Sequence, residues 1–198
     1  MTNGQQRRHG LELLAGELGQ SRKAGIELRI RGDLGHLNLR GRPDGAFVRA
    51  CEDALGQTLP LQPNTFSGDA ERVYWLGPDE WLVVGDAARV EELADQLEQA
   101  LAGRHAAINR LSGGQIALHL SGEPVRNLFA KGCTLDFHPR EFRPGHCAQS
   151  GLAKANVLFG CLDEEGSFEL VVRRSFADYL LRWLCHAGDD HGVRVRDD

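Results

Sequence analysis

The chain has 198 residues, of which 41% are hydrophobic and 26% are charged, and its formal net charge is −5. Such a composition is typical of a chain that buries its core as one large domain or two small ones. The arginines are scattered and the longest apolar runs are far shorter than the ~20 residues that cross a bilayer, so we expect neither a nucleic acid partner nor a membrane span.

Residues 1–24 are predicted to form a polar N-terminal arm. Leu11, Leu14 and Leu18 recur at helical spacing, which suits either docking on a partner or a frayed terminus. The basic start at Arg7 and Arg8 resembles a signal peptide only superficially, because acidic residues interrupt the apolar stretch and no small-residue cleavage site follows. We therefore expect a cytoplasmic protein.

Residues 25–105 are predicted to form a first α+β repeat. GIELRIR at 25–31 alternates like a strand, and LNLRGRP at 37–43 is a second strand that ends at Gly and Pro. An amphipathic helix capped by Gly56 follows, and a hairpin turning at Gly77-Pro78 leads into a helix with Asp86 as its N-cap. That last helix carries one apolar stripe, made of Val90, Leu93, Ala94, Leu97 and Leu101.

Residues 106–188 repeat these motifs in the same order. LHLSGEP at 118–124 matches LNLRGRP, LDFHPREF at 135–142 matches LPLQPNTF at 59–66, and the last strand and helix match those before residue 105. The helix after LHLSGEP is predicted to end at Gly132. Three motifs in one order indicate a duplication of a strand-helix-strand-strand-helix unit with antiparallel pairing, an α+β fold. Residues 189–198 are assigned to a tail of the same compact unit.

Turns in the second repeat are also predicted from glycine. Gly113-Gly114 within LSGGQ is expected to be a hairpin turn, and Asp163 to Gly166 is expected to join two further strands. Ser175 is the predicted N-cap of the last helix. The buried stripe predicted for that helix consists of Phe176, Tyr179, Leu180, Trp183 and Leu184.

The richest chemistry lies in LDFHPREFRPGHC, residues 135–147. His138, His146 and Cys147 are possible zinc ligands, but adjacent residues chelate one ion poorly, and the matching stretch at 59–66 keeps the proline without any histidine or cysteine. A rigid turn is therefore the simpler interpretation. A Cys-His nucleophile pair is possible but needs a lowered thiol pKa.

Other reactive signatures are missing from the sequence. It contains no phosphate-binding glycine loop, no G-x-S-x-G and no H-E-x-x-H. The five cysteines form no C-x-x-C pair, which favours reduced and mostly buried thiols. Trp75 and Trp81 flank the hairpin at Gly77 and would suit an interface if they are exposed.

With WLGPDEWLVV, LSGEPVRNLFAKGCTLDFHPREFRPGHCAQSGLAKANVLF and VVRRSFADYLLRWL in order, the chain resembles the γ subunit family of heterotetrameric sarcosine oxidase over residues 25–188. The resemblance implies a bacterial cytoplasmic complex with α, β and δ subunits that oxidatively demethylates sarcosine to glycine with oxygen. It also implies peroxide formation, transfer of the one-carbon unit to tetrahydrofolate, and FAD, FMN, NAD, tetrahydrofolate and zinc bound by the other subunits.

The same family is related to the folate-binding aminomethyltransferase, whose two similar α+β halves fit the duplication found here. In those enzymes a glycine-rich strand ends in paired aspartates, and the similar stretch here is GLAKA, with Lys154 and Ala155 in the acidic positions. Arg110 stands where the acid of an Asp-apolar-Ser motif would be. The resemblance therefore implies that the folate chemistry has been lost.

Two functions follow as hypotheses. The first is a non-catalytic structural subunit of the oxidase complex, which binds no cofactor or metal itself and contacts its partners through Trp75, Trp81, Arg140 and Arg143. The second is a stand-alone folate-binding protein or aminomethyltransferase-like enzyme. In that case Arg110, Arg143 or Lys154 would attract the glutamate tail of the cofactor.

Overall fold

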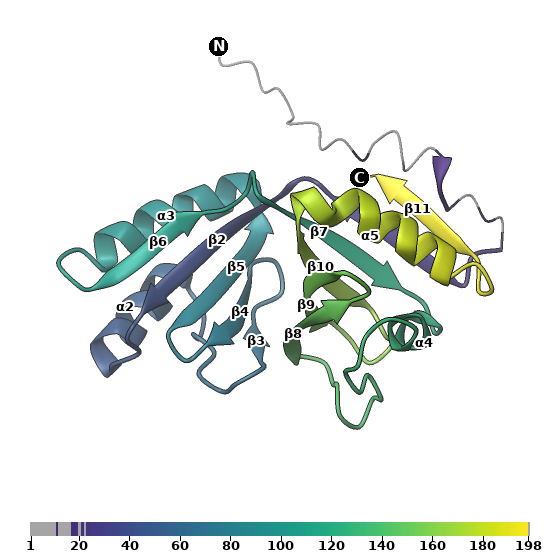
Figure 1. Ribbon diagram of the computed structural model, residues 1–198. Coiled ribbons are helices and arrows are strands. Elements are labelled where there is room, and N and C mark those ends of the chain that lie inside the picture. Colours follow the sequence, from purple (N-terminus) through teal and green to yellow (C-terminus); the bar gives the residue numbers. More distant parts are fainter. Residues whose placement is uncertain (1–10, 12–16, 20, 22, 198) are drawn as a thin grey trace, which may run out of the picture.

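Two β-sheets with helices on their outer sides make up the fold (Figure 1). The computed structural model describes residue 11, residues 17–19, residue 21 and residues 23–197. Within this part, one sheet has five strands in the order β3-β4-β5-β2-β6, and the other has six in the order β11-β1-β7-β10-β9-β8. Ladders are antiparallel except for β1 with β11, so the predicted α+β class with antiparallel sheets is confirmed.

The predicted repetition is visible in the order of elements. The first half contains β2 (Leu34–Gly41), α2 (Gly45–Leu55), β3 (Phe66–Ser67), β4 (Arg72–Gly77), β5 (Glu80–Asp86) and α3 (Ala87–Ala100). The second half contains β7 (Gln115–Ser121), α4 (Val125–Ala130), β8 (Cys147–Leu152), β9 (Ala155–Cys161), β10 (Phe168–Arg173) and α5 (Arg174–Ala187). Both halves therefore run strand, helix, three strands, helix, and in the first half the first of the three strands, β3, is shortened to two residues.

The two halves exchange their first strands. β1 (Ile26–Arg31) precedes β2 in sequence but pairs with β7, placing Leu28 opposite Leu120. β6 (Ala106–Arg110) precedes β7 but pairs with β2, placing Ile108 opposite Leu39. Each sheet thus takes one strand from the other half, β6 at the edge of the five-stranded sheet and β1 between β11 and β7, and the boundaries at 25–105 and 106–188 remain a proposal about ancestry.

The C-terminal residues add one more strand. β11 (Val193–Asp197) pairs in parallel with β1 along the edge of the six-stranded sheet, where the sequence predicted only a tail. The VRVR alternation is a weak sequence signal for a strand, because it is short and lies beside charged and glycine residues. Of the N-terminal arm, Leu11 is buried in the core of the second half and Leu18 packs against it, whereas Leu14 lies outside the described residues.

Local signals at helix ends were predicted with mixed success. Asp86 accepts hydrogen bonds from the amides of residues 88 and 89, and Gly56 ends α2 at φ +68°, as expected. Ser175 is not a cap, because α5 begins one residue earlier and has no side-chain cap. The predicted hairpin at Gly113-Gly114 is also wrong, since the strands on either side of it lie in different sheets.

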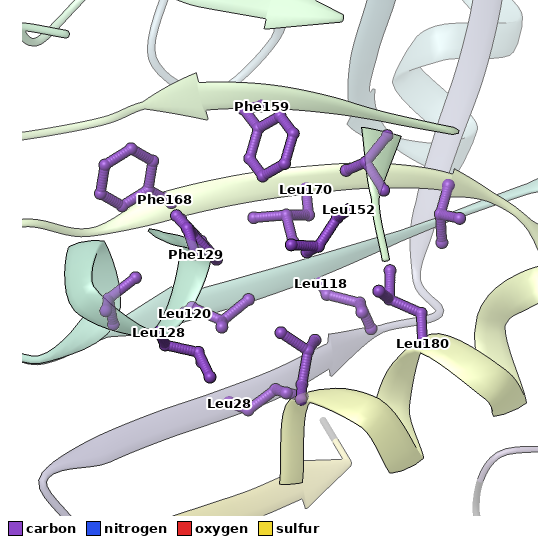
Figure 2. Packing of buried hydrophobic residues seen from close by; sticks show 14 of the residues in the cluster. Leu28, Leu118, Leu120, Leu128, Phe129, Leu152, Phe159, Phe168, Leu170 and Leu180 are labelled. Atoms are coloured by element: carbon purple, nitrogen blue, oxygen red, sulfur yellow. The ribbon is translucent and has the colours of Figure 1, made fainter. Parts of the chain in front are cut away.

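Each half has its own core between helices and sheet. In the first half, side chains of α2 and α3 pack on one face of β2 and β5. In the second half, Leu180 of α5 and Phe129 of α4 pack on Leu118, Phe159 and Leu170 of the sheet (Figure 2). The prediction that Phe176 and Tyr179 are buried is wrong, because these side chains are 40% and 36% exposed. The buried stripe of α5 consists of Ala177, Leu180, Leu181 and Leu184.

Candidate functional site

The inner faces of the two sheets face each other and form the region with the most unusual chemistry. Because side chains alternate along a strand, the residues between those packed on the helices point to the opposite sheet. Their apolar part is a third buried cluster, made of Leu34, Tyr74, Leu82, Val84, Ala117, Cys147, Leu158 and Val171. Polar and charged side chains occupy the space on either side of it.

A cleft of about 550 Å³ opens between the sheets beside this cluster. Amide side chains line much of it, from Asn38, Gln115, Gln149 and Asn156. Glu80 contributes the one carboxylate among the described lining residues, and it is engaged by the Asn38 amide at 2.8 Å and by the Arg40 guanidinium at 3.3 Å. The cleft is therefore polar, and its carboxylate is already hydrogen-bonded to an amide and paired with a guanidinium.

Glu169 of β10 carries the other notable charge between the sheets. Its side chain is fully buried, and the Tyr74 hydroxyl donates to its Oε1 at 2.7 Å. The Arg72 guanidinium donates to both carboxylate oxygens at 3.2 and 2.8 Å, and His119 Nε2 lies 2.6 Å from Oε2. Arg72 and Tyr74 come from β4 and Glu169 and His119 from β10 and β7, so this cluster joins the two sheets.

The charge state of the cluster follows from these contacts. Burial alone would raise the pKa of Glu169, but hydrogen bonds from His119 and Arg72 outweigh it and hold that pKa far below its ordinary value. Arg31 Nη1 lies 3.4 Å from His119 Nδ1. The Nε and Nη2 atoms of Arg31 donate to the Asp33 carboxylate at 2.9 and 2.7 Å. Glu169 is therefore an ionised structural carboxylate with its lone pairs occupied.

His36 of β2 lies near this cluster in a contrasting environment. The residue is 1% exposed, and neither ring nitrogen has a hydrogen-bond partner among the described residues. Burial lowers the pKa of the imidazole to about 4, against an opposing effect of Glu169. His36 is consequently neutral at pH 7, and its backbone, not its ring, makes contacts, to Ser112 Oγ at 3.1 Å and to Leu111 N at 2.8 Å.

Sequence reasoning missed this inter-sheet cluster. A signal existed in FELVV, where Glu169 interrupts a run that is otherwise apolar, and in LHL, where His119 does the same. A charged residue inside a buried strand requires a partner. The sequence does not indicate that the partner is Arg72, which is 97 positions away.

The positions that resemble the aminomethyltransferase site lie at or near the cleft. Gly151 lines it, while Lys154 is exposed in the turn between β8 and β9 and Ala155 is buried. Arg110 is paired with Glu91 at 2.8 Å and Asp95 at 2.5 Å and also with Glu98, all three on α3. The Arg110 side chain points to α3, where three carboxylates already surround its single positive charge. Arg110 is therefore poorly placed to bind a further carboxylate.

The stretch at 135–147 is a structural turn. Phe137 and Phe142 insert into the aromatic core beside Phe168, and Arg126 Nη1 donates to the carbonyls of Phe137 and Phe142 at 2.6 and 2.9 Å. His138 Nδ1 accepts from the Arg140 amide at 3.2 Å, which stiffens the turn.

The zinc and nucleophile alternatives for this stretch are not supported. His146 Nδ1 lies 3.1 Å from the Glu141 carbonyl, and the Cys147 thiol donates to the Thr65 carbonyl at 3.2 Å. Burial raises the pKa of Cys147 to about 12, which opposes the thiolate that either role needs. The described residues hold no group of three potential ligands around one point.

The four predicted interface residues are placed differently. Trp81 is fully buried in the first half and its indole donates to the Pro60 carbonyl at 2.7 Å, so it is unavailable to a partner, and that expectation is corrected. Trp75 is half-buried, and Arg140 and Arg143 are exposed. Trp81 faces the helices of the first half, which cover its indole. Its position beside the hairpin turn did not indicate which face of the strand it occupies.

No helix within the described part of the chain is long and apolar enough to span a bilayer.

Comparison with known proteins identifies the family of the chain. The model of the family described as "Sarcosine oxidase, gamma subunit family" matches residues 40–190. A sarcosine oxidase subunit gamma of Corynebacterium sp. strain P-1 is 33% identical over 184 residues, which is 91% of this chain and 89% of the relative. Its counterpart in strain U-96 is 33% identical over 153 residues, 76% of this chain and 73% of the relative.

Solved structures give the same result. A chain of the heterotetrameric sarcosine oxidase from Corynebacterium sp. U-96 in complex with pyrrole 2-carboxylate matches with a TM-score of 0.86 and 29% identity, over 94% of this chain and 97% of that one. The glycine cleavage system aminomethyltransferase T from Bartonella henselae matches with a TM-score of 0.62 and 17% identity, over 88% of this chain and 48% of that one. The latter likeness is one of fold.

Proposed function

The chain belongs to the sarcosine oxidase gamma subunit family, and from this membership we propose that it is a non-catalytic structural subunit of a heterotetrameric oxidase. The proposed complex oxidatively demethylates sarcosine to glycine in the cytoplasm and passes the one-carbon unit to tetrahydrofolate. Its other members are the α, β and δ subunits. The match to a chain of a heterotetrameric sarcosine oxidase over nearly the whole length supports this proposal.

The observation that carries the non-catalytic role is the state of the inter-sheet cleft. Proton transfer to a bound one-carbon group needs a carboxylate or imidazole with access to it. The one carboxylate among the described lining residues is held by Asn38 and Arg40, and the GLAKA stretch supplies Gly151 to the lining rather than an acid. His36 and Glu169 are buried and are not among the residues that line the cleft.

The described residues also fit poorly with the cofactors of the proposed complex. Zinc needs thiolate, imidazole or carboxylate ligands arranged around one point, and the Cys51 and Cys147 thiols have pKa values raised to about 12 by burial. Of the cations considered for a folate glutamate tail, Arg110 is committed to α3 and the exposed Arg143 and Lys154 do not line the cleft, so Arg173 is the one cation among the described lining residues. We therefore place FAD, FMN, NAD, tetrahydrofolate and zinc on the other subunits.

Contact with those subunits is proposed to involve the surface of Trp75, Arg140 and Arg143. Aromatic and arginine side chains are the groups that most often anchor interfaces. The turn carrying both arginines is fixed from below by the Phe137 and Phe142 rings, and Arg143 Nε donates to the Arg140 carbonyl at 2.8 Å. A rigid turn loses little conformational entropy when a partner covers it.

Co-purification and calorimetry test the proposal together. The four subunits are co-expressed with an affinity tag on this chain, and we expect the other three at equal stoichiometry. Titration of the purified chain with tetrahydrofolate is expected to give no binding heat. Micromolar binding of tetrahydrofolate by the chain alone would favour the stand-alone folate protein, and recovery of the chain without partners would contradict the subunit role.

A further inference from the structure

The duplication supplies an internal comparison between α3 and α5. Both helices have 14 residues and follow the last strand of their half directly. Aligned from their first residues, they match at every buried position, with Val90, Leu93, Ala94 and Leu97 of α3 opposite Ala177, Leu180, Leu181 and Leu184 of α5. The two helices therefore sit on their sheets with the same face.

Their solvent faces differ. Arg89 and Glu92 of α3 form an ion pair at 3.0 Å, and the aligned residues of α5 are Phe176 and Tyr179. These aromatic side chains are 40% and 36% exposed, and among the described residues only Leu61 shares their class of exposed large apolar side chains. Since α3 adopts the same position with a charged pair, the fold itself does not need aromatic residues there.

The surroundings of the aromatic pair are charged unevenly. The exposed Arg173 precedes α5, and among the described residues the helix has no acidic residue in its first turn and no side-chain cap, so its N-terminal end carries positive charge. The carboxylate nearest along the helix, Asp178, is bound to Arg182 at 2.6 Å. A surface that covers Phe176 and Tyr179 would meet net positive charge at the N-terminal end of the helix.

We propose that Phe176 and Tyr179 form a docking surface, the α5 face, for another subunit of the oxidase complex, next to the start of the helix, where the exposed Arg173 also lines the inter-sheet cleft. The inference rests on the proposed subunit role and names a second contact region. Figure 1 places α5 on the outer side of the six-stranded sheet, in the same half of the molecule as the loop between α4 and β8, which carries Arg140 and Arg143 and lies at the lower edge of the view. The partner surface is an apolar groove with a carboxylate facing the start of α5.

Charge argues for a different subunit rather than a second copy of this chain. Two copies related by a two-fold axis bring the same patch against itself, so each patch must supply its own complement. The α5 face supplies one carboxylate, Asp178, which is already paired with Arg182. An aromatic pair with adjacent positive charge instead suits the composition of a hetero-interface, in which aromatic and arginine residues are enriched.

The repeat also supplies the test. Exchanging the pair for its α3 counterpart, Phe176→Arg with Tyr179→Glu, keeps a side-chain pair that this helix position tolerates in the first half. We expect recovery of the other subunits with the tagged chain to fall at least about tenfold from the co-expressed complex. The matched control, Arg89→Glu with Glu92→Arg on α3, is expected to recover them at the wild-type ratio.

The outcomes separate this inference from the subunit role. Absence of partners with the wild-type chain contradicts the subunit role, whereas equal recovery by the wild type and the α5 variant overturns the α5 face alone. Amide exchange in the wild-type proteins decides the matter if the variant misfolds: residues 174–182 should exchange at least about tenfold more slowly in the complex than in the isolated full chain. Unchanged exchange, or a wild-type homodimer that the α5 variant abolishes, would also overturn it.

Discussion

At the scale of single residues, Glu169 is the group on which the contact between the sheets most depends. A buried carboxylate is costly unless hydrogen bonds satisfy it, and Tyr74, Arg72 and His119 together do so. The arrangement specifies how the two sheets meet, because Arg72 and Tyr74 come from β4 of the opposite sheet and would lose the carboxylate if the sheets slipped. Removal of one partner leaves the others buried and unpaired.

Glu169→Gln is expected to destabilise the chain by about 3 to 5 kcal/mol, since the buried Arg72 guanidinium would lose its counter-charge. Urea unfolding followed by circular dichroism measures this. Glu98→Gln is the control, because Arg110 is more than one third exposed and keeps Glu91 and Asp95, so we expect a change below about 0.5 kcal/mol. Similar losses for the two variants would contradict the assigned importance of Glu169.

His36 predicts how stability depends on pH. Its pKa is about 4 in the folded chain and 6.5 when exposed, so on acidification the unfolded state takes up a proton before the folded state does. Stability contributed by this group is complete above pH 6.5 and is lost as the pH falls towards 4, by about 3 kcal/mol. The pKa of Glu169 is also lowered in the folded chain. The loss of stability that its protonation causes begins only as the pH falls to near the ordinary pKa of glutamate.

His36→Leu isolates that effect. An apolar side chain of similar volume leaves no unpaired ring nitrogen, so stability at pH 7 should be unchanged or higher. The decline between pH 6.5 and pH 4 should shrink by about 3 kcal/mol in urea titrations at a series of pH values. His105→Leu, at an exposed position, should retain the wild-type decline, and a variant at position 36 that also retains it would refute the assignment.

The sequence predicted single residues well only where the signal was local. Asp86 and Gly56 could be identified as caps because a cap depends on its immediate neighbours. Trp81 was misjudged as exposed, and the Glu169 cluster was missed, because both depend on which face of a strand meets the opposite layer. That information lies in residues that are distant in the sequence.

At the scale of elements, α3 and α5 occupy equivalent positions in the two halves but differ in how their N-terminal ends are capped. Asp86 Oδ1 accepts from the amides of Ala88 and Arg89 at 3.0 Å, whereas α5 has no side-chain cap. The buried stripes of the two helices nevertheless match position for position. Packing on the sheet therefore holds both helices, and the cap adds a smaller increment to α3.

Asp86→Ala is expected to cost about 1 kcal/mol, because two amides at the start of α3 lose their acceptor. Thermal and urea unfolding measure the change. Gln96→Ala, at an exposed position within the same helix, should be neutral or slightly stabilising, since alanine has a higher helix propensity. A loss from Asp86→Ala no larger than that from Gln96→Ala would show that the cap contributes nothing.

The buried face of α5 could not be chosen from its sequence. Phe176, Leu180 and Trp183 recur at helical spacing, and so do Ala177, Leu181 and Leu184. Two neighbouring apolar stripes fit a 3.6-residue period equally well, and the larger aromatic side chains make the wrong one look more hydrophobic. Comparison with α3 resolves the choice, because charged residues there occupy the positions aligned with Phe176 and Tyr179.

At the scale of the whole molecule, exchange of β1 and β6 makes the halves mutually dependent. Ile26, Leu28 and Ile30 of β1 are completely buried, and they are buried in the core of the other half. The sequence could predict that 25–31 is a strand but not its sheet, because its alternation fits the edge of either. The duplication was predictable from three motifs, whereas the exchange depends on how the two copies associate.

This dependence predicts the behaviour of the two halves as fragments. Residues 1–105 alone would leave the three apolar side chains of β1 without their sheet, and residues 106–198 alone would lack that strand between β7 and β11. At about 2 kcal/mol for each buried side chain, the loss is comparable to the stability of a small domain. We expect neither fragment to unfold cooperatively by circular dichroism, and equimolar mixing to restore the transition in a concentration-dependent way. Cooperative unfolding of either fragment alone would show that the exchanged strand is dispensable, because the remaining helices and strands of that half would then suffice for its core.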